Sequence, residues 1–266
     1  MSLNINNYPY KTWGETFPNH KVTFDKLYIE DSWGKFFDAE MKKPYFKKRI
    51  LDPLSEELKE SNGTIKIFPY PELLFNAFNT TPIDDVKVVI IGQDPYFNCI
   101  NHKDKQIPQA MGLSFSVPCG MPIPSSLSNI YKNLKKYNHI SKSTKHGNLK
   151  LWAVQGCLML NASLTVRYGE KNSHSNLWRS LTDKIIKYIS DKKENIVFVI
   201  WGGSALRKLR LINSNKHKVI ISSHPSGLSY NKKLRNYPPF SECDHFGEIN
   251  NFLMEQKKRI ILWNTI

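Results

Sequence analysis

Four short apolar runs in this 266-residue chain each end on glycine or polar residues. The runs are rich in Val and Ile and continuous rather than alternating, which is typical of strands covered on both faces of a sheet. They are VKVVII before Gly92, LML before Asn161, VFVIW before Gly202 and KVIISS before His224. Because open α/β folds form their binding crevice at the carboxyl ends of such strands, the sequence predicts a site there.

Helical patterns lie between the apolar runs. Apolar residues three and four positions apart predict an amphipathic helix over 176–192. Ser126 is expected to cap a helix that follows it, and 204–213 and 245–258 also favour helix. Strands alternating with helices pair in parallel through right-handed crossovers. We therefore expect a three-layer α/β/α fold with a central, mostly parallel sheet of about four strands.

A chain of this length without a Pro-rich or Gly/Ser-rich linker favours one large domain. We expect residues 21–266 to form it, with the polar residues 1–20 as an N-terminal extension open to disorder. The sequence shows neither an apolar stretch long enough to span a bilayer nor a leader peptide. This favours an intracellular protein without membrane attachment, and leaves nucleus, cytoplasm and viral compartment open.

The four cysteines are scattered and form no C-x-x-C pair, which argues against a zinc or iron–sulfur site. A long chain without a leader also favours free thiols over disulfides. The run Cys243-Asp244-His245 resembles one corner of a metal site, but no second cluster completes it. We therefore expect no metal and no cofactor.

The charge balance is strongly basic, with 38 Lys and Arg against 23 Asp and Glu, a formal net charge of +15. A field of this sign attracts nucleic acid or an anionic membrane surface. Lysines at 132–136 are also explained as a solvated helix face. The cluster at 232–235 is different, because it follows His224 closely and should lie beside the crevice.

Six motifs in the chain, in this order, resemble those of uracil-DNA glycosylases of the family-1 type. The resemblance extends from about residue 33 to 264, and the order of the motifs leaves little room for chance. The motifs are GQDPY at 92–96, GLSFSV at 112–117, PIPSSLSNIY at 122–131, LNASLTVR at 160–167 with Met159 before it as a substitution, WGG at 201–203 and HPSGLS at 224–229.

The resemblance implies that Asp94 and His224 are catalytic. Cleavage of the bond between a sugar and uracil builds positive charge on the sugar and negative charge on the base. Asp94 would stabilise the sugar and orient water, and a neutral His224 would donate to uracil O2. The alternative interpretation takes Asp94, before Pro95, as the cap of a helix or turn. It takes His224, before Pro225, as a turn histidine.

Four residues would read the base: Gln93, Tyr96, Phe115 and Asn161. The Asn161 amide offers one donor and one acceptor, which match uracil and not cytosine. By the resemblance, Phe115 stacks on the base, Tyr96 excludes the thymine methyl and Gln93 lies near O4. Taken alone, Asn161 is also a turn former, and the two aromatic residues are also core or packing residues.

A base inside a duplex must be extruded to reach such a pocket. Leu228 matches the apolar residue that fills the vacated stack in the family, although an exposed Leu also suits partner binding. Hydroxyl groups and backbone N–H groups in three loops would hold phosphates. The residues expected to bind DNA in this way are Ser125, Ser126, Gly202, Gly203 and Ser226.

Three residues depart from the family pattern. Phe97 replaces the usual histidine after DPY, Gly203 replaces a serine and Gly227 replaces a proline. The segments 97–108 and 230–240 are longer than is typical, and both flank the expected site.

The expected partners are single- and double-stranded DNA that contains uracil, with a protein inhibitor of the glycosylase or a replication protein as further partners. We expect a monomer without membrane association. An alternative function is a DNA-binding replication accessory protein on a glycosylase scaffold, although Asp94 and His224 count against it. A glycosylase of relaxed specificity is disfavoured by Tyr96 and Asn161 together, and no P-loop motif is present.

Overall fold

The computed structural model describes residues 3–103, 105–142 and 144–264. Its centre is a parallel sheet of four strands in the order β5-β2-β7-β8, flanked by helices on both faces. This confirms the α/β architecture expected from the sequence. The central strands are β2 (Val88–Gly92), β5 (Cys157–Asn161), β7 (Val197–Trp201) and β8 (Lys218–Ser222).

All residues of β2, β5 and β7 are buried, as their continuous apolar sequences require. The register pairs Gly92 with Asn161 and Trp201 with Ser222, so all four strands end at the same edge of the sheet. Two small antiparallel pairs lie outside this sheet. They are β1 (Ile67–Phe68) with β6 (Val166–Arg167) and β3 (Cys99–His102) with β4 (Lys105–Pro108).

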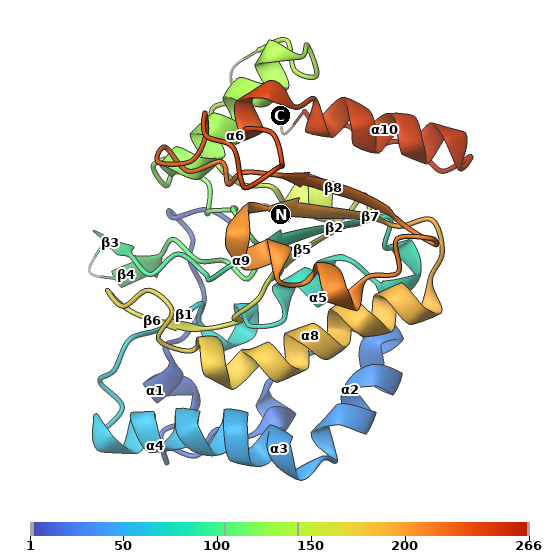
Figure 1. Ribbon diagram of the computed structural model, residues 1–266. Helices are drawn as coiled ribbons and strands as arrows, with labels where there is room; N and C mark the ends of the chain where they lie inside the picture. Colours follow the sequence, from blue (N-terminus) through green and yellow to red (C-terminus); the bar gives the residue numbers. More distant parts are fainter. Residues whose placement is uncertain (1–2, 104, 143, 265–266) are drawn as a thin grey trace.

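Helices α6 and α10 lie on one side of the sheet and α5 and α8 on the other, with α2, α3 and α4 beyond α8 (Figure 1). Among the described residues, no helix has the length and apolar character to cross a bilayer. The helices are α1 (Trp13–Thr16), α2 (Gly34–Met41), α3 (Pro44–Phe46), α4 (Asp52–Glu60), α5 (Asn76–Thr80), α6 (Ser125–Lys136), α7 (Lys150–Ala153), α8 (Ser175–Lys192), α9 (Gly202–Leu206) and α10 (His245–Glu255).

Helix α8 confirms the helix expected over 176–192, and α10 covers most of 245–258. The expected cap at Ser126 is wrong, because α6 begins at Ser125 and Pro124 is its N-cap. The helix expected over 204–213 is two short pieces, α9 and a 3₁₀ turn at Leu209–Leu211. The break falls at Arg207, the C-cap of α9, and Lys208, the N-cap of the 3₁₀ turn.

The N-terminal segment packs on the domain through aromatic residues. Tyr8, Trp13 and Phe17 are buried in the same apolar core as the central strands. Backbone hydrogen bonds also join Leu3 and Ile5 to Cys119. Residues 3–20 therefore belong to the packing of the domain, and the boundary at residue 21 stays a prediction.

Glu40 joins the N-terminal helices to α8. The residue is 6 % exposed. Its carboxylate lies 2.8 Å from Lys184 Nζ and 2.6 Å from the Tyr45 hydroxyl, and it also pairs with Lys43. Burial alone would raise the pKa of Glu40, but these three partners together lower it to about 2. The charged form of Glu40 therefore stabilises the folded protein.

We expect Glu40→Gln to lower the free energy of unfolding by about 2 kcal/mol at pH 7, since it removes charged hydrogen bonds. The pKa of Glu40 is lower in the folded state, so its stabilising effect is complete above about pH 4.5. The effect is lost as the pH falls toward 2, and the difference between the two proteins should shrink there. Urea denaturation at several pH values measures this.

The matched control is Asp38→Asn, on the same helix. Asp38 is exposed, and its side chain makes no hydrogen bond or ion pair with any residue that the structure describes. Its replacement should change stability by less than about 0.5 kcal/mol. An equal loss in both variants would contradict the role given to Glu40.

Candidate active site

A pocket of about 560 Å³ opens at the carboxyl ends of the central strands. It brings together all the predicted site residues except Ser125, which lies at the exposed start of α6. Further residues of the wall include Phe97, Lys171, Trp201 and Ser204. The predicted residues that line it are Gln93, Asp94, Tyr96, Phe115, Ser126, Asn161, Gly202, Gly203, His224, Ser226 and Leu228.

Asp94 lies in the turn directly after β2. Its Oδ2 accepts a hydrogen bond of 2.8 Å from the backbone N–H of Asn172. Its Oδ1 is buried and has no hydrogen-bond partner among the described residues. Burial raises the pKa of Asp94, while the Asn172 N–H and the Lys171 cation act in the opposite direction. Oδ1 is thus the oxygen able to accept a hydrogen bond from water or substrate.

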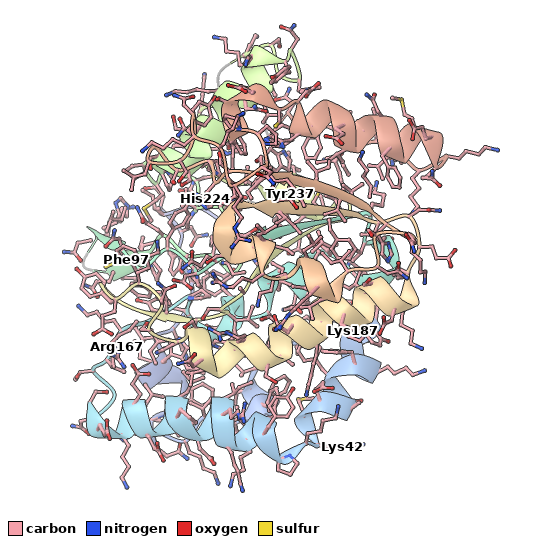
Figure 2. The ribbon with its side chains drawn as sticks, viewed as in Figure 1. Lys42, Phe97, Arg167, Lys187, His224 and Tyr237 are labelled. Atoms are coloured by element: carbon pink, nitrogen blue, oxygen red, sulfur yellow. The ribbon has the colours of Figure 1, made fainter. Side chains whose placement is uncertain are left out.

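His224 follows β8 and lies near α9 and the ends of β7 and β8 (Figure 2). Its Nδ1 lies 3.0 Å from the backbone nitrogen of Ser226, which donates to it. Burial, with a smaller contribution from Lys171, lowers the pKa of His224 to about 4. The ring is therefore neutral at pH 7 and carries its hydrogen on Nε2, which makes Nε2 a hydrogen-bond donor.

Glycine at 202 is required for the approach of His224. Gly202 has φ of +89°, a conformation that side chains rarely adopt, and a Cβ there would lie 2.8 Å from His224 Cβ. Gly203, the next residue, has no positive φ, and a Cβ there would meet only Leu234 Cδ1 at 3.9 Å. Only Gly202, of these two glycines, is required to leave space for His224.

Asn161 and Phe115 form the inner wall. Asn161 is 7 % exposed, and a side chain at Gly92 would collide with its Oδ1. Phe115 has φ of +62°, a strained conformation for a bulky residue and typical of functional sites. Its ring centroid lies 5.8 Å from that of His224, and its carbonyl accepts a 3.3 Å hydrogen bond from the Tyr96 hydroxyl.

Asn172 is a functional residue that the sequence reasoning missed. Besides holding Asp94, its Oδ1 accepts a hydrogen bond from the side chain of Gln93. The Gln93 side chain is therefore already engaged in the free protein. The polar run Asn172-Ser173-His174 between β6 and α8 was the one sequence feature that could have indicated a functional loop. Nothing in its spacing indicates a contact with Asp94.

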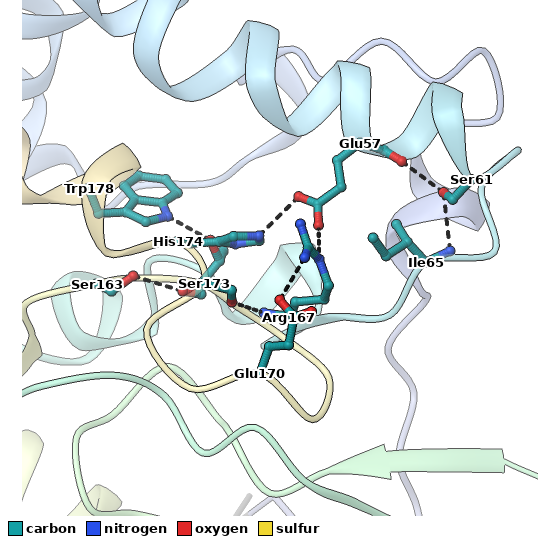
Figure 3. Close-up of polar contacts among 10 residues, drawn as sticks. Glu57, Ser61, Ile65, Ser163, Arg167, Glu170, Ser173, His174 and Trp178 are labelled. Carbon is teal, nitrogen blue, oxygen red and sulfur yellow. Dashed lines mark hydrogen bonds and ion pairs between the residues drawn. The ribbon is translucent and has the colours of Figure 1, made fainter.

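The loop that carries Asn172 is held by Glu57 of α4 (Figure 3). Glu57 lies 2.5 Å from Arg167 Nε and 2.9 Å from His174 Nε2, and Arg167 also pairs with Glu170. Burial alone would raise the pKa of Glu57, but His174 and Arg167 lower it below its usual value. The ionised carboxylate therefore fixes both ends of the segment 167–174.

The outer rim of the pocket is exposed. The Leu228 side chain is 84 % exposed, far more than a packing residue would be. A side chain at Gly227 would meet no atom within 4 Å. The basic cluster 232–235 follows on the same loop, and its three cations Lys232, Lys233 and Arg235 are all exposed.

The run Cys243-Asp244-His245 forms a helix cap. The Asp244 carboxylate accepts a hydrogen bond of 3.0 Å from the backbone N–H of Gly247 and contacts His139. The His245 ring is buried next to the Phe240 carbonyl. Across residues 3–103, 105–142 and 144–264, no group of three or more His, Cys, Asp or Glu residues is placed to hold a metal ion.

A partly buried carboxylate and a neutral imidazole face one pocket at the carboxyl edge of a parallel sheet, an arrangement suited to a hydrolytic enzyme. Residues 78–253 match the family model described as the Uracil DNA glycosylase superfamily. The chain belongs to this superfamily.

Named relatives are similar over nearly the whole chain. The chain is 41 % identical to a probable uracil-DNA glycosylase of Acanthamoeba polyphaga mimivirus, covering 98 % of this chain and 72 % of the relative. It is 41 % identical to the uracil-DNA glycosylase of Campylobacter lari, covering 91 % and 98 %.

Solved structures agree with this comparison. The crystal structure of mimivirus uracil-DNA glycosylase matches with a TM-score of 0.92 at 40 % identity, covering 98 % of this chain and 96 % of that chain. A variant of the mimivirus protein in complex with UGI matches with the same score, covering 98 % of each chain.

We expect Gly202→Ala to lower the free energy of unfolding by about 1–3 kcal/mol, because alanine is strained at positive φ. The added methyl group should also displace His224, seen as a change in its ring signals by NMR. Gly203→Ala is the control and should leave both unchanged. Equal behaviour of the two variants would show that Gly202 does not set the position of His224.

Proposed function

We propose that this protein hydrolyses the N-glycosidic bond of uracil in DNA and releases free uracil, leaving an abasic site for base-excision repair. We further propose that it is of the family-1 type, which the superfamily match does not resolve. The observation that carries the proposal is the pocket in which Asp94 and His224 lie with Asn161, Phe115 and Tyr96. Named uracil-DNA glycosylases 41–43 % identical to this chain support it.

Asp94 acts on the sugar. As the bond to uracil lengthens, positive charge develops on the sugar, and the ionised carboxylate stabilises it. The unpaired Oδ1 orients a water molecule for attack, while the Asn172 N–H holds Oδ2. The carboxylate forms no covalent bond with the sugar. Water adds to the sugar carbon as the bond to uracil N1 breaks. Asp94 accepts the proton that this water loses, and uracil departs as an anion that takes up a proton from solvent.

His224 acts on the departing base. Its Nε2–H donates a hydrogen bond to uracil O2 as negative charge accumulates there. The Ser226 N–H holds the opposite ring nitrogen, so the donor is aimed before substrate binds. A pKa of about 4 keeps the ring neutral at pH 7.

The inner wall selects the base. The Asn161 amide accepts from uracil N3–H and donates to O4, a pattern that cytosine cannot satisfy. Phe115 stacks on the base, and Tyr96 lies against C5 and excludes a methyl group. Gln93 contributes near O4 through its backbone, since its side chain is bonded to Asn172.

The rim extrudes the nucleotide from DNA. Leu228, exposed on its loop, fills the space that the base leaves in the stack. Ser125 and Ser126 at the start of α6, with Gly202, Gly203 and Ser226, hold phosphates through hydroxyl and N–H groups. The basic surface attracts single- and double-stranded DNA.

We propose that the protein acts as a monomer and binds a protein inhibitor of the kind seen with the mimivirus relative. A replication protein as partner, action inside the cell and the absence of membrane association stay predictions. A replication accessory in which catalysis is secondary is not favoured, because the site has both catalytic groups and the named relatives are enzymes.

We expect Asp94→Asn and His224→Ala each to slow uracil release by about 10²–10⁴-fold, the range for positioned acid–base and electrostatic groups. Single- and double-stranded oligonucleotides with one uracil, followed by alkaline cleavage at the abasic site, measure this under single-turnover conditions. Thermal unfolding checks that each variant folds. Near-normal excision by a folded variant would remove its residue from the mechanism.

The two parts of base selection should fail in different ways. Asn161→Asp offers acceptors to the cytosine amino group, so weak cytosine release should appear while uracil release falls. Tyr96→Ala opens space at C5, so thymine should become a slow substrate. Each new activity will be feeble, because a methyl-sized contact is worth only about 1–3 kcal/mol.

Mass spectrometry of the released bases decides between these outcomes. Release of thymine by the Asn161 variant, or of cytosine by the Tyr96 variant, would show that the proposal assigns these two side chains to the wrong edges of the base. Both variants are compared with the wild-type protein on the same three oligonucleotides, which differ only in the target base.

A further inference from the structure

Lys171 is a cation on the pocket wall that the proposed mechanism does not use. It is exposed, and it makes no hydrogen bond or ion pair with any residue in the part of the chain that the structure describes. Its neighbour Asn172 donates the 2.8 Å hydrogen bond to Asp94. The backbone at 171 is therefore one residue from direct contact with the catalytic carboxylate.

The backbone that carries Lys171 is held in place before substrate binds. The segment 167–174 is held at both ends by Glu57, and the backbone N–H of Gly169 donates a 3.0 Å hydrogen bond to the Phe97 carbonyl. A lysine on a braced loop loses less conformational freedom on binding than one on a mobile loop. This favours a binding role over a solvated surface charge.

Charge balance indicates what Lys171 binds. An ammonium group beside Asp94 opposes the positive charge that develops on the sugar, unless an anion covers it. Uracil leaves on the side of His224, whereas each nucleotide sugar carries backbone phosphates close to it. An ammonium group with no partner in the free protein is suited to such a phosphate.

We propose that Lys171 binds a backbone phosphate next to the extruded nucleotide, and so completes the site on the Asp94 side. This assignment rests on the proposed uracil excision. It adds to the loops at Ser126, Gly203 and Ser226, which line other parts of the same pocket. Lys171 also acts on the two catalytic groups, since its charge lowers the pKa of both Asp94 and His224.

The first test measures binding to a duplex that carries a stable abasic analogue, at several salt concentrations. Lys171→Ala should weaken binding by about tenfold and reduce the slope of log affinity against log salt by about 1, the loss of one phosphate contact. Lys171→Arg should restore both. This measurement requires no reaction, so its outcome is separate from that of the excision assay.

The control is Lys42→Ala, an exposed lysine at the end of α2, well separated from His224 (Figure 2). It should leave the salt slope at the wild-type value. An unchanged slope in Lys171→Ala, or an equal change in Lys42→Ala, would overturn the assignment.

The second test is the pH dependence of single-turnover excision. Without the Lys171 charge, the pKa values of Asp94 and His224 both rise, and activity requires Asp94 ionised and His224 neutral. The acid limb of Lys171→Ala should therefore move to higher pH, while Lys171→Arg should keep the wild-type limb. A shifted limb with an unchanged salt slope would also overturn phosphate binding, since the lysine would then act on the catalytic groups alone.

Discussion

The backbone hydrogen bonds that join β2, β5, β7 and β8 determine where Asp94, Asn161 and His224 lie. Their parallel register places Gly92 opposite Asn161, so the turn that carries Asp94 begins beside the amide that faces the base. The register of β7 with β8 likewise places Trp201 opposite Ser222, two residues before His224. A shift of one residue in either pair would turn buried side chains to the opposite face of the sheet. The core thus enforces the geometry of the site.

The second constraint is close packing at the ends of these strands. Gly92 leaves room for Asn161, and Gly202 leaves room for His224. Such packing removes water from Asp94 and His224, which raises the pKa of the acid and lowers that of the base. For His224 this favours the neutral donor. For Asp94 it opposes the charged form, so the Asn172 N–H and the Lys171 cation are needed to offset burial.

The four strands and their common edge could be predicted, because each strand rests on a local run of residues. The candidate site residues could be named only through the resemblance of six motifs to a known family. The packing of residues 3–20 could not be predicted, since Tyr8 and Trp13 are isolated aromatic residues in a polar stretch. Asn172 and Lys171 were missed for another reason. Asn172 lies 78 positions from Asp94 in the sequence and binds it through a backbone N–H, which every residue type except proline could supply. Contacts of that kind leave no signal in composition or periodicity.

Phe97 and Lys171 bring opposite chemistry to the wall of the same pocket. Phe97, where the family usually has histidine, lines the pocket without offering a polar contact. An apolar side chain at that position cannot hold a phosphate or water through a hydrogen bond. Lys171 lines the same pocket from a loop that is bonded to the Phe97 carbonyl through Gly169. A cation there lowers the pKa of Asp94 and offers an anion contact, the two functions that phenylalanine cannot supply. The positive charge that offsets the burial of Asp94 therefore comes from the 167–174 segment and not from position 97.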